Sequence, residues 1–357
     1  MHQSPTPAEI TYAATLLRAG RLVAFPTETV YGLGANALDP EAVARIYAVK
    51  RRPSTSPLIV HVASVEMAES LVSDWPRAAG LLTREFWPGP LTLVLSKKTR
   101  HENDRTGVPL VQTSQYTAAP TASLVPDIVT AGLSTVAVRM PSHPVALSLI
   151  CAAGVPLAAP SANRFTELSS TTASHVRLSL GNEVDLILDG GPCQVGIEST
   201  VLSLADPHCP VLLRPGGISR QRIESLIGPI ASANEAPTGA HPSPGMHPRH
   251  YSPRTSLLLV SNGTLPAQGK GIYLQYMHPP TRPTHLATSN IPSGAEPRDI
   301  MIMQMPIAPA DYAAALYSRL HQADEAGLDW IAVDHPPTTP DWEAVLDRLR
   351  RAATKGR

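Results

Sequence analysis

The sequence predicts an α/β (α+β) protein with a sizeable twisted sheet, followed by a smaller second α/β unit. Two observations support this fold class. Short apolar segments alternate with helical patterns as far as about residue 230. Residues 231–253 are then rich in Pro, Gly, Ser and His and contain few large apolar side chains, which is typical of an extended linker. At 357 residues the chain is long enough for two domains.

The first helix has a clear start and a clear stop. Thr6, Pro7 and Glu9 supply an N-cap, a proline at the first helical position and the acid of a capping box, and Gly20 ends the helix. The segment RLVAFP at 21–26 then predicts a strand, and Asp39 with the proline after it predicts the start of a second helix that runs to about Lys50.

The remaining elements follow the same alternation. Strands are predicted where short apolar runs begin, at 58, 91, 135, 155, 185, 199 and 211, with helices over 143–153, 171–180 and 219–227. Beyond the linker, strands are predicted at 257, 271, 299 and 330, with helices over 310–326 and 341–353. The polar, aperiodic stretch 99–124 resembles an insertion of roughly two dozen residues.

Composition excludes several classes of protein. The net charge is zero and only 16% of the residues are charged, whereas a bulk nucleic-acid binder usually has a basic excess. The three cysteines form no C-x-x-C pair, which argues against a zinc site and suits a reducing cytosol. The chain shows neither a signal-peptide core nor an apolar run of membrane-spanning length, so we expect a cytoplasmic protein without membrane contact.

Common nucleotide-binding and hydrolase motifs are also absent from the sequence. GLGANA at 32–37 fits G-x-G-x-x-A, but no acidic residue follows about 20 positions later, so we interpret its glycines as a close backbone approach in a turn. The sequence contains no G-x-x-x-x-G-K-[ST], no G-x-S-x-G and no H-E-x-x-H.

The most informative stretch is KRRPSTSPLIVH at 50–61. Pro53 disfavours helix at Arg52, so a helix carrying Lys50 should end here with three cations at its carboxyl end. Such cations are suited to an anion with several oxygens, for example a nucleotide phosphate. Other polar residues are predicted in strands or near strand ends, where α/β proteins bind ligands: Thr29, His61, Arg139, Ser161, Asn163, Ser199 and Arg214.

Six motifs, in order along the chain, resemble those of the YrdC-type threonylcarbamoyl-AMP synthase family in its longer, two-domain form. They are PTETVYGLGANA at 26–37, KRRP…SPLIVH, APSAN at 159–163, GIEST at 196–200, LRPGG at 213–217 and SPGMHPRHYSP at 243–253. The resemblance implies a YrdC-like catalytic domain over 1–230, a linker or lid over 231–253 and a small Rossmann-like domain over 254–357.

The resemblance also implies residue roles. Lys50 and Arg52 match a K-x-R motif that binds ATP phosphates and is catalytic, and Ser161 and Asn163 match an S-x-N motif that holds the nucleotide with them. Further nucleotide contacts are implied for Ser56, Thr135, Ser169, Arg214 and Tyr251. Thr29, His61, Arg139 and Ser199 match residues that hold L-threonine, with the backbone of Ala159 beside them. Two departures are Ser56 in place of the common Asn, and Arg-Phe-Thr at 164–166 in place of a smaller, more flexible loop that leads to Ser169.

The implied reaction joins L-threonine, bicarbonate or CO2, and ATP into L-threonylcarbamoyladenylate and pyrophosphate. A tRNA threonylcarbamoyl transferase complex would use the product, and contact with tRNA is an accompanying expectation. Mg2+ is implied by the ATP chemistry, with no protein ligand to name, so it should be carried by phosphates and water.

Two other classes stay open: a non-catalytic module that binds double-stranded RNA or tRNA, and a regulator that senses threonine and ATP. A carbamoyltransferase of hydrogenase maturation has a related domain, but this chain lacks its zinc-finger cysteine pairs.

Overall fold

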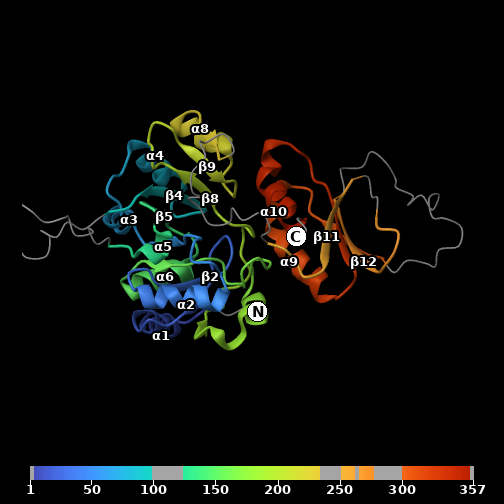
Figure 1. Cartoon of the computed structure of the whole chain (residues 1–357), viewed down its shortest axis with the longest axis horizontal. Coiled ribbons are helices and arrows are strands. Elements are labelled where there is room, and N and C mark those ends of the chain that lie inside the picture. Colours follow the sequence, from blue (N-terminus) through green and yellow to red (C-terminus); the bar gives the residue numbers. More distant parts are fainter. Residues whose placement is uncertain (1–3, 99–123, 234–250, 262–264, 277–299, 354–357) are drawn as a thin grey trace, which may run out of the picture.

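The computed structural model describes residues 4–98, 124–233, 251–261, 265–276 and 300–353 (Figure 1). Nearly all of the predicted insertion at 99–124 and most of the predicted linker or lid at 231–253 lie outside these described residues. Among the described residues, no helix is both long enough and apolar enough to cross a bilayer.

A mixed sheet of ten described strands organises the first part of the chain. Its spatial order is β10-β9-β8-β4-β5-β3-β6-β2-β1-β7. The strands are β1 (Val23–Phe25), β2 (Gly32–Asn36), β3 (Ile59–His61), β4 (Leu91–Ser96), β5 (Thr135–Arg139), β6 (Leu157–Ala158), β7 (Leu186–Ile187), β8 (Thr200–Ser203), β9 (Val211–Arg214) and β10 (Ala231–Ser232). The sheet contains parallel pairs such as β3–β5 and antiparallel pairs such as β4–β5, so the predicted sizeable sheet is confirmed and is of mixed type.

Successive strand residues point to opposite faces of the sheet, so one strand can pack against a different set of helices on each face. In β1, Val23 and Phe25 pack into one apolar cluster with α1 (Pro7–Arg18) and α6 (Pro144–Ala153). Ala24 belongs instead to the main core, which also takes side chains from α2 (Pro40–Lys50). The other helices of this part are α3 (Val65–Leu71), α4 (Arg77–Phe86), α5 (Asp127–Thr130), α7 (Ala173–Leu180) and α8 (Arg220–Ile227).

The helix boundaries read from the sequence are confirmed in detail. Thr6 and Glu9 form the capping box of α1, and the Asp39 side chain accepts from two backbone N–H groups at the start of α2. Arg51, the residue after α2, has a left-handed backbone with φ of 52°, so the chain leaves the helix before Arg52 as Pro53 requires.

The prediction of a turn at GLGANA was wrong. These residues form β2, which pairs antiparallel with β1. The close approach itself is present, because a Cβ on Gly34 would lie 2.6 Å from the Phe25 ring. The two glycines therefore allow β2 to pack against the Phe25 ring. The segment lacks the alternation of apolar and polar residues that normally marks a strand, so its sequence did not indicate one.

The second part of the chain is a smaller α/β unit, seen in orange and red in Figure 1. Its sheet has the order β11-β14-β12-β13, and all its strand pairs are parallel. The elements are β11 (Ser256–Val260), β12 (Gly271–Tyr276), β13 (Ile300–Met305), β14 (Trp330–Asp334), α9 (Pro309–Glu325) and α10 (Glu343–Ala353). An all-parallel sheet in which α9 connects β13 to β14 agrees with the Rossmann-like arrangement that was predicted.

Candidate functional site

One face of the central strands is kept free of the main helical core. Side chains on this face include a small apolar cluster of Ile59, Val94, Ala137, Val201 and Leu213, one from each of five neighbouring strands. At one end of this cluster, the next residues on the same face of four of these strands are polar. Strand periodicity therefore puts His61, Thr92, Arg139 and Ser199 beside an apolar floor, at one edge of it.

A cavity of about 50 Å³ opens at this edge. The sequence-predicted residues in its wall are Thr29, Arg52, His61, Arg139, Ala159, Ser161, Ser199, Arg214 and Tyr251. These residues are brought together from segments that span more than half of the chain. The wall also contains Glu198, which the sequence analysis did not name.

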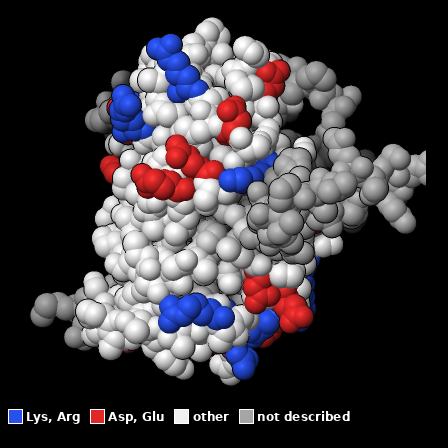
Figure 2. Space-filling model, turned by 90° about the vertical axis from the view of Figure 1, so that its left-hand side faces the viewer, with Lys and Arg blue, Asp and Glu red and all other residues white. Residues whose placement is uncertain are grey.

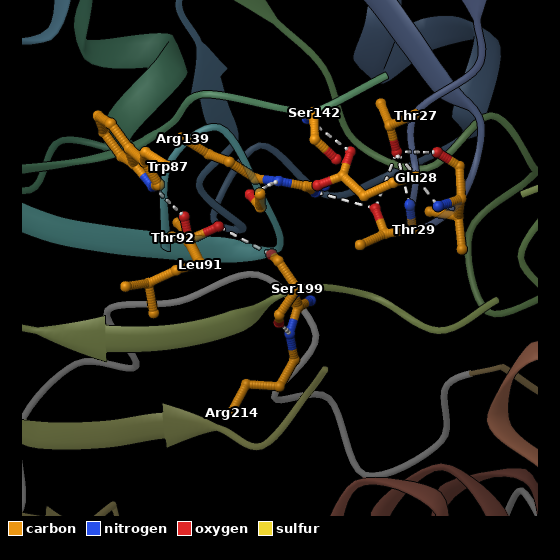
Figure 3. Close-up of polar contacts among 12 residues, drawn as sticks. Thr27, Glu28, Thr29, Trp87, Leu91, Thr92, Arg139, Ser142, Ser199 and Arg214 are labelled. Atoms are coloured by element: carbon orange, nitrogen blue, oxygen red, sulfur yellow. Dashed lines mark hydrogen bonds and ion pairs between the residues drawn. The ribbon is translucent and has the colours of Figure 1, made fainter. Parts of the chain in front are cut away.

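Arg139 is the best-anchored cation of the cavity (Figure 3). Its Nη2 donates to Oε1 of Glu28 at 2.6 Å, its Nη1 donates to Oγ1 of Thr29 at 2.9 Å, and its Nε donates to the Gly89 carbonyl at 3.2 Å. Both Arg139 and Glu28 are buried. A guanidinium fixed in this way presents a defined pair of donor nitrogens to a carboxylate.

Ser199 is held from two sides. Its Oγ lies 2.8 Å from Oγ1 of Thr92 and accepts from Nη2 of Arg214 at 3.1 Å, and its carbonyl accepts from Nε of Arg214 (Figure 3). Thr92 is fully buried on β4, which pairs with β8 where Ser199 leads into that strand. The two hydroxyls and the guanidinium thus form a polar wall opposite Arg139.

His61 is a neutral, buried imidazole. Burial, together with the nearby charge of Arg139, lowers the pKa of His61 to about 3. Its Nδ1 is buried without a hydrogen-bond partner among the described residues. An unsatisfied buried ring nitrogen at a cavity wall is costly unless a ligand or water pairs with it.

The K-x-R residues lie at the other side of the cavity. Nζ of Lys50 donates to the carbonyls of Ser161 and Asn163, and burial together with the charge of Arg52 holds the pKa of Lys50 well below its ordinary value. Burial also lowers the pKa of Arg52, to about 10. Arg52 Nε and Asn163 Oδ1 are buried without partners within the described part of the chain, as expected of groups that await a polar ligand.

Five predicted residues do not line the cavity: Lys50, Ser56, Thr135, Asn163 and Ser169. Lys50 and Asn163 stand directly behind Ser161, whereas the carbonyl of Ser56 accepts from the Tyr47 hydroxyl. Thr135 is on the open face of β5, four residues before Arg139, or about 13 Å along the strand. Ser169 is fully buried and donates to Glu198.

Glu198 connects the cavity to the second unit of the chain. Its carboxylate accepts from Ser169 Oγ at 2.5 Å, from the Tyr317 hydroxyl on α9 at 3.2 Å and from Arg348 Nε on α10 at 2.9 Å. Burial alone would raise the pKa of Glu198, but the charges of Arg348 and Arg214 outweigh it and the pKa is lowered. Glu198 is therefore an ionised group in a dry interface.

Sequence reasoning missed Glu28, Thr92, Glu198 and Arg348. Glu28 and Glu198 lie inside PTETV and GIEST, two motifs that the sequence analysis had already named. Membership of these motifs was the signal that could have identified both residues. Thr92 in LTLVLS and Arg348 in DRLRRA resemble an ordinary strand threonine and an ordinary surface arginine, so nothing local marks them.

The described residues of the site do not include a cluster of metal-binding side chains. The described residues contain no group of three or more His, Cys, Asp or Glu that could hold an ion. Two buried carboxylates, Glu198 in the cavity wall and Glu28 behind Arg139, are each paired with an arginine. We therefore derive no step through a protein-bound Mg2+.

The fold and cavity define a class: a two-part α/β protein with a buried, polar ligand site at one edge of a mixed sheet. A family profile described as "Telomere recombination" (Sua5/YciO/YrdC) matches residues 15–117 and 108–216, and one described as "Threonylcarbamoyl-AMP synthase, C-terminal domain" matches 218–354. The chain belongs to the Sua5/YciO/YrdC family, in the form that carries this C-terminal domain.

Individual relatives extend the match over nearly the full length. The threonylcarbamoyl-AMP synthase of Bacillus subtilis (strain 168) is 42% identical over 357 residues, which cover 98% of this chain and 94% of that protein. The Pyrococcus abyssi enzyme of the same name is 38% identical and covers 97% and 94%. A crystal structure of P. abyssi Sua5 complexed with L-threonine aligns with a TM-score of 0.78 at 35% identity, covering 98% of this chain and 96% of that one.

Other relatives match a smaller share of the chain. A putative threonylcarbamoyl-AMP synthase of Mycobacterium tuberculosis is 37% identical over 224 residues, which are 63% of this chain and 91% of that protein.

Proposed function

We propose that this protein is a threonylcarbamoyl-AMP synthase that forms L-threonylcarbamoyladenylate and pyrophosphate from L-threonine, bicarbonate or CO2, and ATP. The observation that carries this proposal is the convergence of nine sequence-predicted site residues on one cavity. The full-length relatives that share both parts of the chain have this name, which supports the same activity here.

The Arg139 edge of the cavity is the proposed threonine site. The guanidinium takes the amino-acid carboxylate, while Thr29, Ser199 and the neutral His61 offer short hydrogen bonds to the hydroxyl and amine. A neutral imidazole suits this place because it can accept from an amine without repelling it.

Lys50 and Arg52 form the proposed phosphate side, with Ser161 and Asn163 beside them. In the proposed reaction the threonine amine is carboxylated, the new carboxylate attacks the α-phosphate, and pyrophosphate leaves. Cations fixed behind the phosphates stabilise the charge that develops during transfer. Ser56, Thr135, Ser169, Arg214 and Tyr251 remain proposed nucleotide contacts, and Thr135 at the far end of the apolar floor marks the direction in which the nucleoside would extend.

The cavity has a volume of only about 50 Å³. Tyr251 is buried in its wall, with its ring centre 5.5 Å from the guanidinium carbon of Arg348 and 5.9 Å from the ring centre of Tyr317. We infer that Tyr251 leaves this position when ATP enters. Exclusion of water around the bound nucleotide would then protect a hydrolysis-prone product.

Mg2+ would arrive with the ATP phosphates, and bicarbonate or CO2 as a co-substrate. We propose a cytoplasmic enzyme organised as domains 1–230 and 254–357 with a linker at 231–253. Its product would pass to a tRNA threonylcarbamoyl transferase complex.

We also propose direct contact with tRNA, although the distribution of surface charge does not favour it. On the face seen in Figure 2, Lys and Arg side chains are interspersed with Asp and Glu.

The deciding experiment measures pyrophosphate release from ATP with threonine and bicarbonate each present or omitted. Release that requires both, with the adenylate identified by its mass, is the expected result. ATP and threonine binding without release would instead support the sensing alternative. Binding of RNA with steep salt dependence and no release would support the RNA-binding alternative.

A further inference from the structure

We propose that Glu28 is a positioning residue for L-threonine: it sets the orientation of the Arg139 guanidinium by joining two segments that meet at the cavity. This proposal rests on the proposed function, and it assigns a role to a buried carboxylate that does not itself line the cavity.

The two oxygens of Glu28 have different donors. Oε1 accepts from Arg139 Nη2 at 2.6 Å, and Oε2 accepts from the backbone N–H of Ser142 at 3.1 Å (Figure 3). Ser142 belongs to the loop that follows β5, three residues after Arg139. The carboxylate therefore holds both the side chain at the end of β5 and the backbone just beyond it.

Glu28 is itself fixed by the loop that carries it. Thr27 Oγ1 accepts from the N–H groups of Thr29 and Val30 at 3.2 Å and donates to the Val30 carbonyl at 2.6 Å, which closes a tight turn around position 28. The Glu28 carbonyl also accepts from the N–H of Val195 at 2.7 Å. The support for Arg139 is thus a rigid turn and not a flexible surface side chain.

The arrangement leaves a defined part of Arg139 for a ligand. A guanidinium has five N–H groups. Three of them donate to Glu28, Thr29 and Gly89. Within the described part of the chain, Nη1 and Nη2 each keep one N–H without a protein acceptor, and Arg139 lines the cavity, so these N–H groups are available to a ligand carboxylate. Rotation of the guanidinium would change which N–H groups face the ligand.

Substitution of Glu28 by glutamine tests the role with little change in size. A carboxylate accepts at both oxygens, whereas the glutamine amide accepts at one and donates at the other. Glu28→Gln must therefore place an NH2 group against either Arg139 or the Ser142 N–H. The matched control is Asp185→Asn, which weakens a carboxylate–arginine pair to Arg45 at 3.0 Å on the periphery of the same domain.

The experiment is calorimetric titration of the full chain with L-threonine and, separately, with ATP. For Glu28→Gln we expect the Kd for L-threonine to rise at least tenfold and the Kd for ATP to stay within about twofold of wild type. In turnover, KM for threonine should rise with kcat nearly kept. Asp185→Asn should match wild type in all of these values.

Unchanged threonine affinity in a folded Glu28→Gln protein would overturn the positioning role, as would an equal loss of ATP affinity. If Glu28→Gln does not fold, Glu28→Asp takes its place: it keeps the charge but is too short to reach both donors, so threonine affinity should still fall while ATP affinity holds. Wild-type protein that binds threonine without releasing pyrophosphate would contradict the proposed function and leave this test valid. Absence of threonine binding by wild type would overturn both.

Discussion

At the scale of single residues, the site combines buried charges with unmatched polar atoms. Arg52 Nε, His61 Nδ1 and Asn163 Oδ1 have no partner among the described residues, although a buried polar atom without a partner costs about 1–3 kcal/mol. Such costs are tolerated where a ligand removes them. The same logic predicts that substitutions here reduce activity more than stability.

Lys50→Ala and Arg52→Ala should each lower kcat/KM by roughly 10- to 150-fold, because a hydrogen bond to a charged group contributes about 1.5–3 kcal/mol. Thermal unfolding monitored by circular dichroism should show that both variants stay folded. Turnover by Lys50→Ala at the wild-type rate would contradict its assignment to the phosphates.

Thr92→Val should raise the KM for threonine by roughly 2- to 13-fold, because the isosteric change removes only the hydroxyl that pairs with Ser199 Oγ, a neutral bond of about 0.5–1.5 kcal/mol. The matched control is Thr83→Val in α4, where a buried threonine hydroxyl bonds to the Ala79 carbonyl of its own helix. If both variants shift KM equally, the pairing with Ser199 has no specific role.

At the scale of elements, the local signals predicted most of the fold. Capping residues placed α1 and α2 within a residue or two, and apolar runs located the strands, because these features act over a few neighbouring residues. The strand β2 was missed because its glycines are explained only by Phe25 on the neighbouring strand. Likewise, Thr92 and Arg348 gain their roles from partners 107 and 150 residues away, which no local pattern reports.

Two helices from different parts of the chain meet through a histidine pair. The rings of His175 on α7 and His321 on α9 stack with centroids 3.8 Å apart, and His321 Nε2 lies 3.1 Å from the Ser169 carbonyl. Burial, together with the charge of His321, lowers the pKa of His175 to about 4, and burial lowers that of His321. Both rings are therefore neutral near pH 7 and stack without repulsion.

This pair should make stability depend on pH in the acid range. In the unfolded chain histidine titrates near 6.5, above the folded value, so the stabilising contribution is complete above about pH 6.5 and is lost as the pH falls toward 4. In His175→Gln, the fall of Tm between pH 7 and pH 5 should be smaller by roughly 2–4 °C, the shift expected for about 1 kcal/mol. Replacement of the exposed His208 is the control, and it should leave the fall of Tm between pH 7 and pH 5 as in wild type.

At the scale of the whole molecule, the second unit supports the wall of the site through its contacts with Glu198. Arg348 bonds to the Glu198 carboxylate, to the Glu198 carbonyl and to the Pro215 carbonyl. Close backbone packing adds to this: a Cβ on Gly196, whose φ is 72°, would lie 2.5 Å from Ala314 Cα on α9.

Arg348→Met should destabilise the protein by about 3–5 kcal/mol, because it leaves the Glu198 carboxylate buried without its nearest cation. The double variant with Glu198→Gln should recover part of that loss in denaturant unfolding. The control is Arg222→Ala, whose partner Glu85 is exposed, with an expected change of about 0–1 kcal/mol. Equal effects of Arg348→Met and Arg222→Ala would show that the buried pair is energetically unimportant.

The ion pair between Glu198 and Arg348 joins residues 150 positions apart, which has a consequence for synthesis on the ribosome. At about 5–20 residues per second, roughly 8–30 s separate translation of the two residues. During that interval the nascent first domain holds a carboxylate beside its cavity without the arginine that later neutralises it. The ion pair behind the cavity is therefore completed late, and a nascent chain stalled before Arg348 should be less stable to denaturant than the full chain.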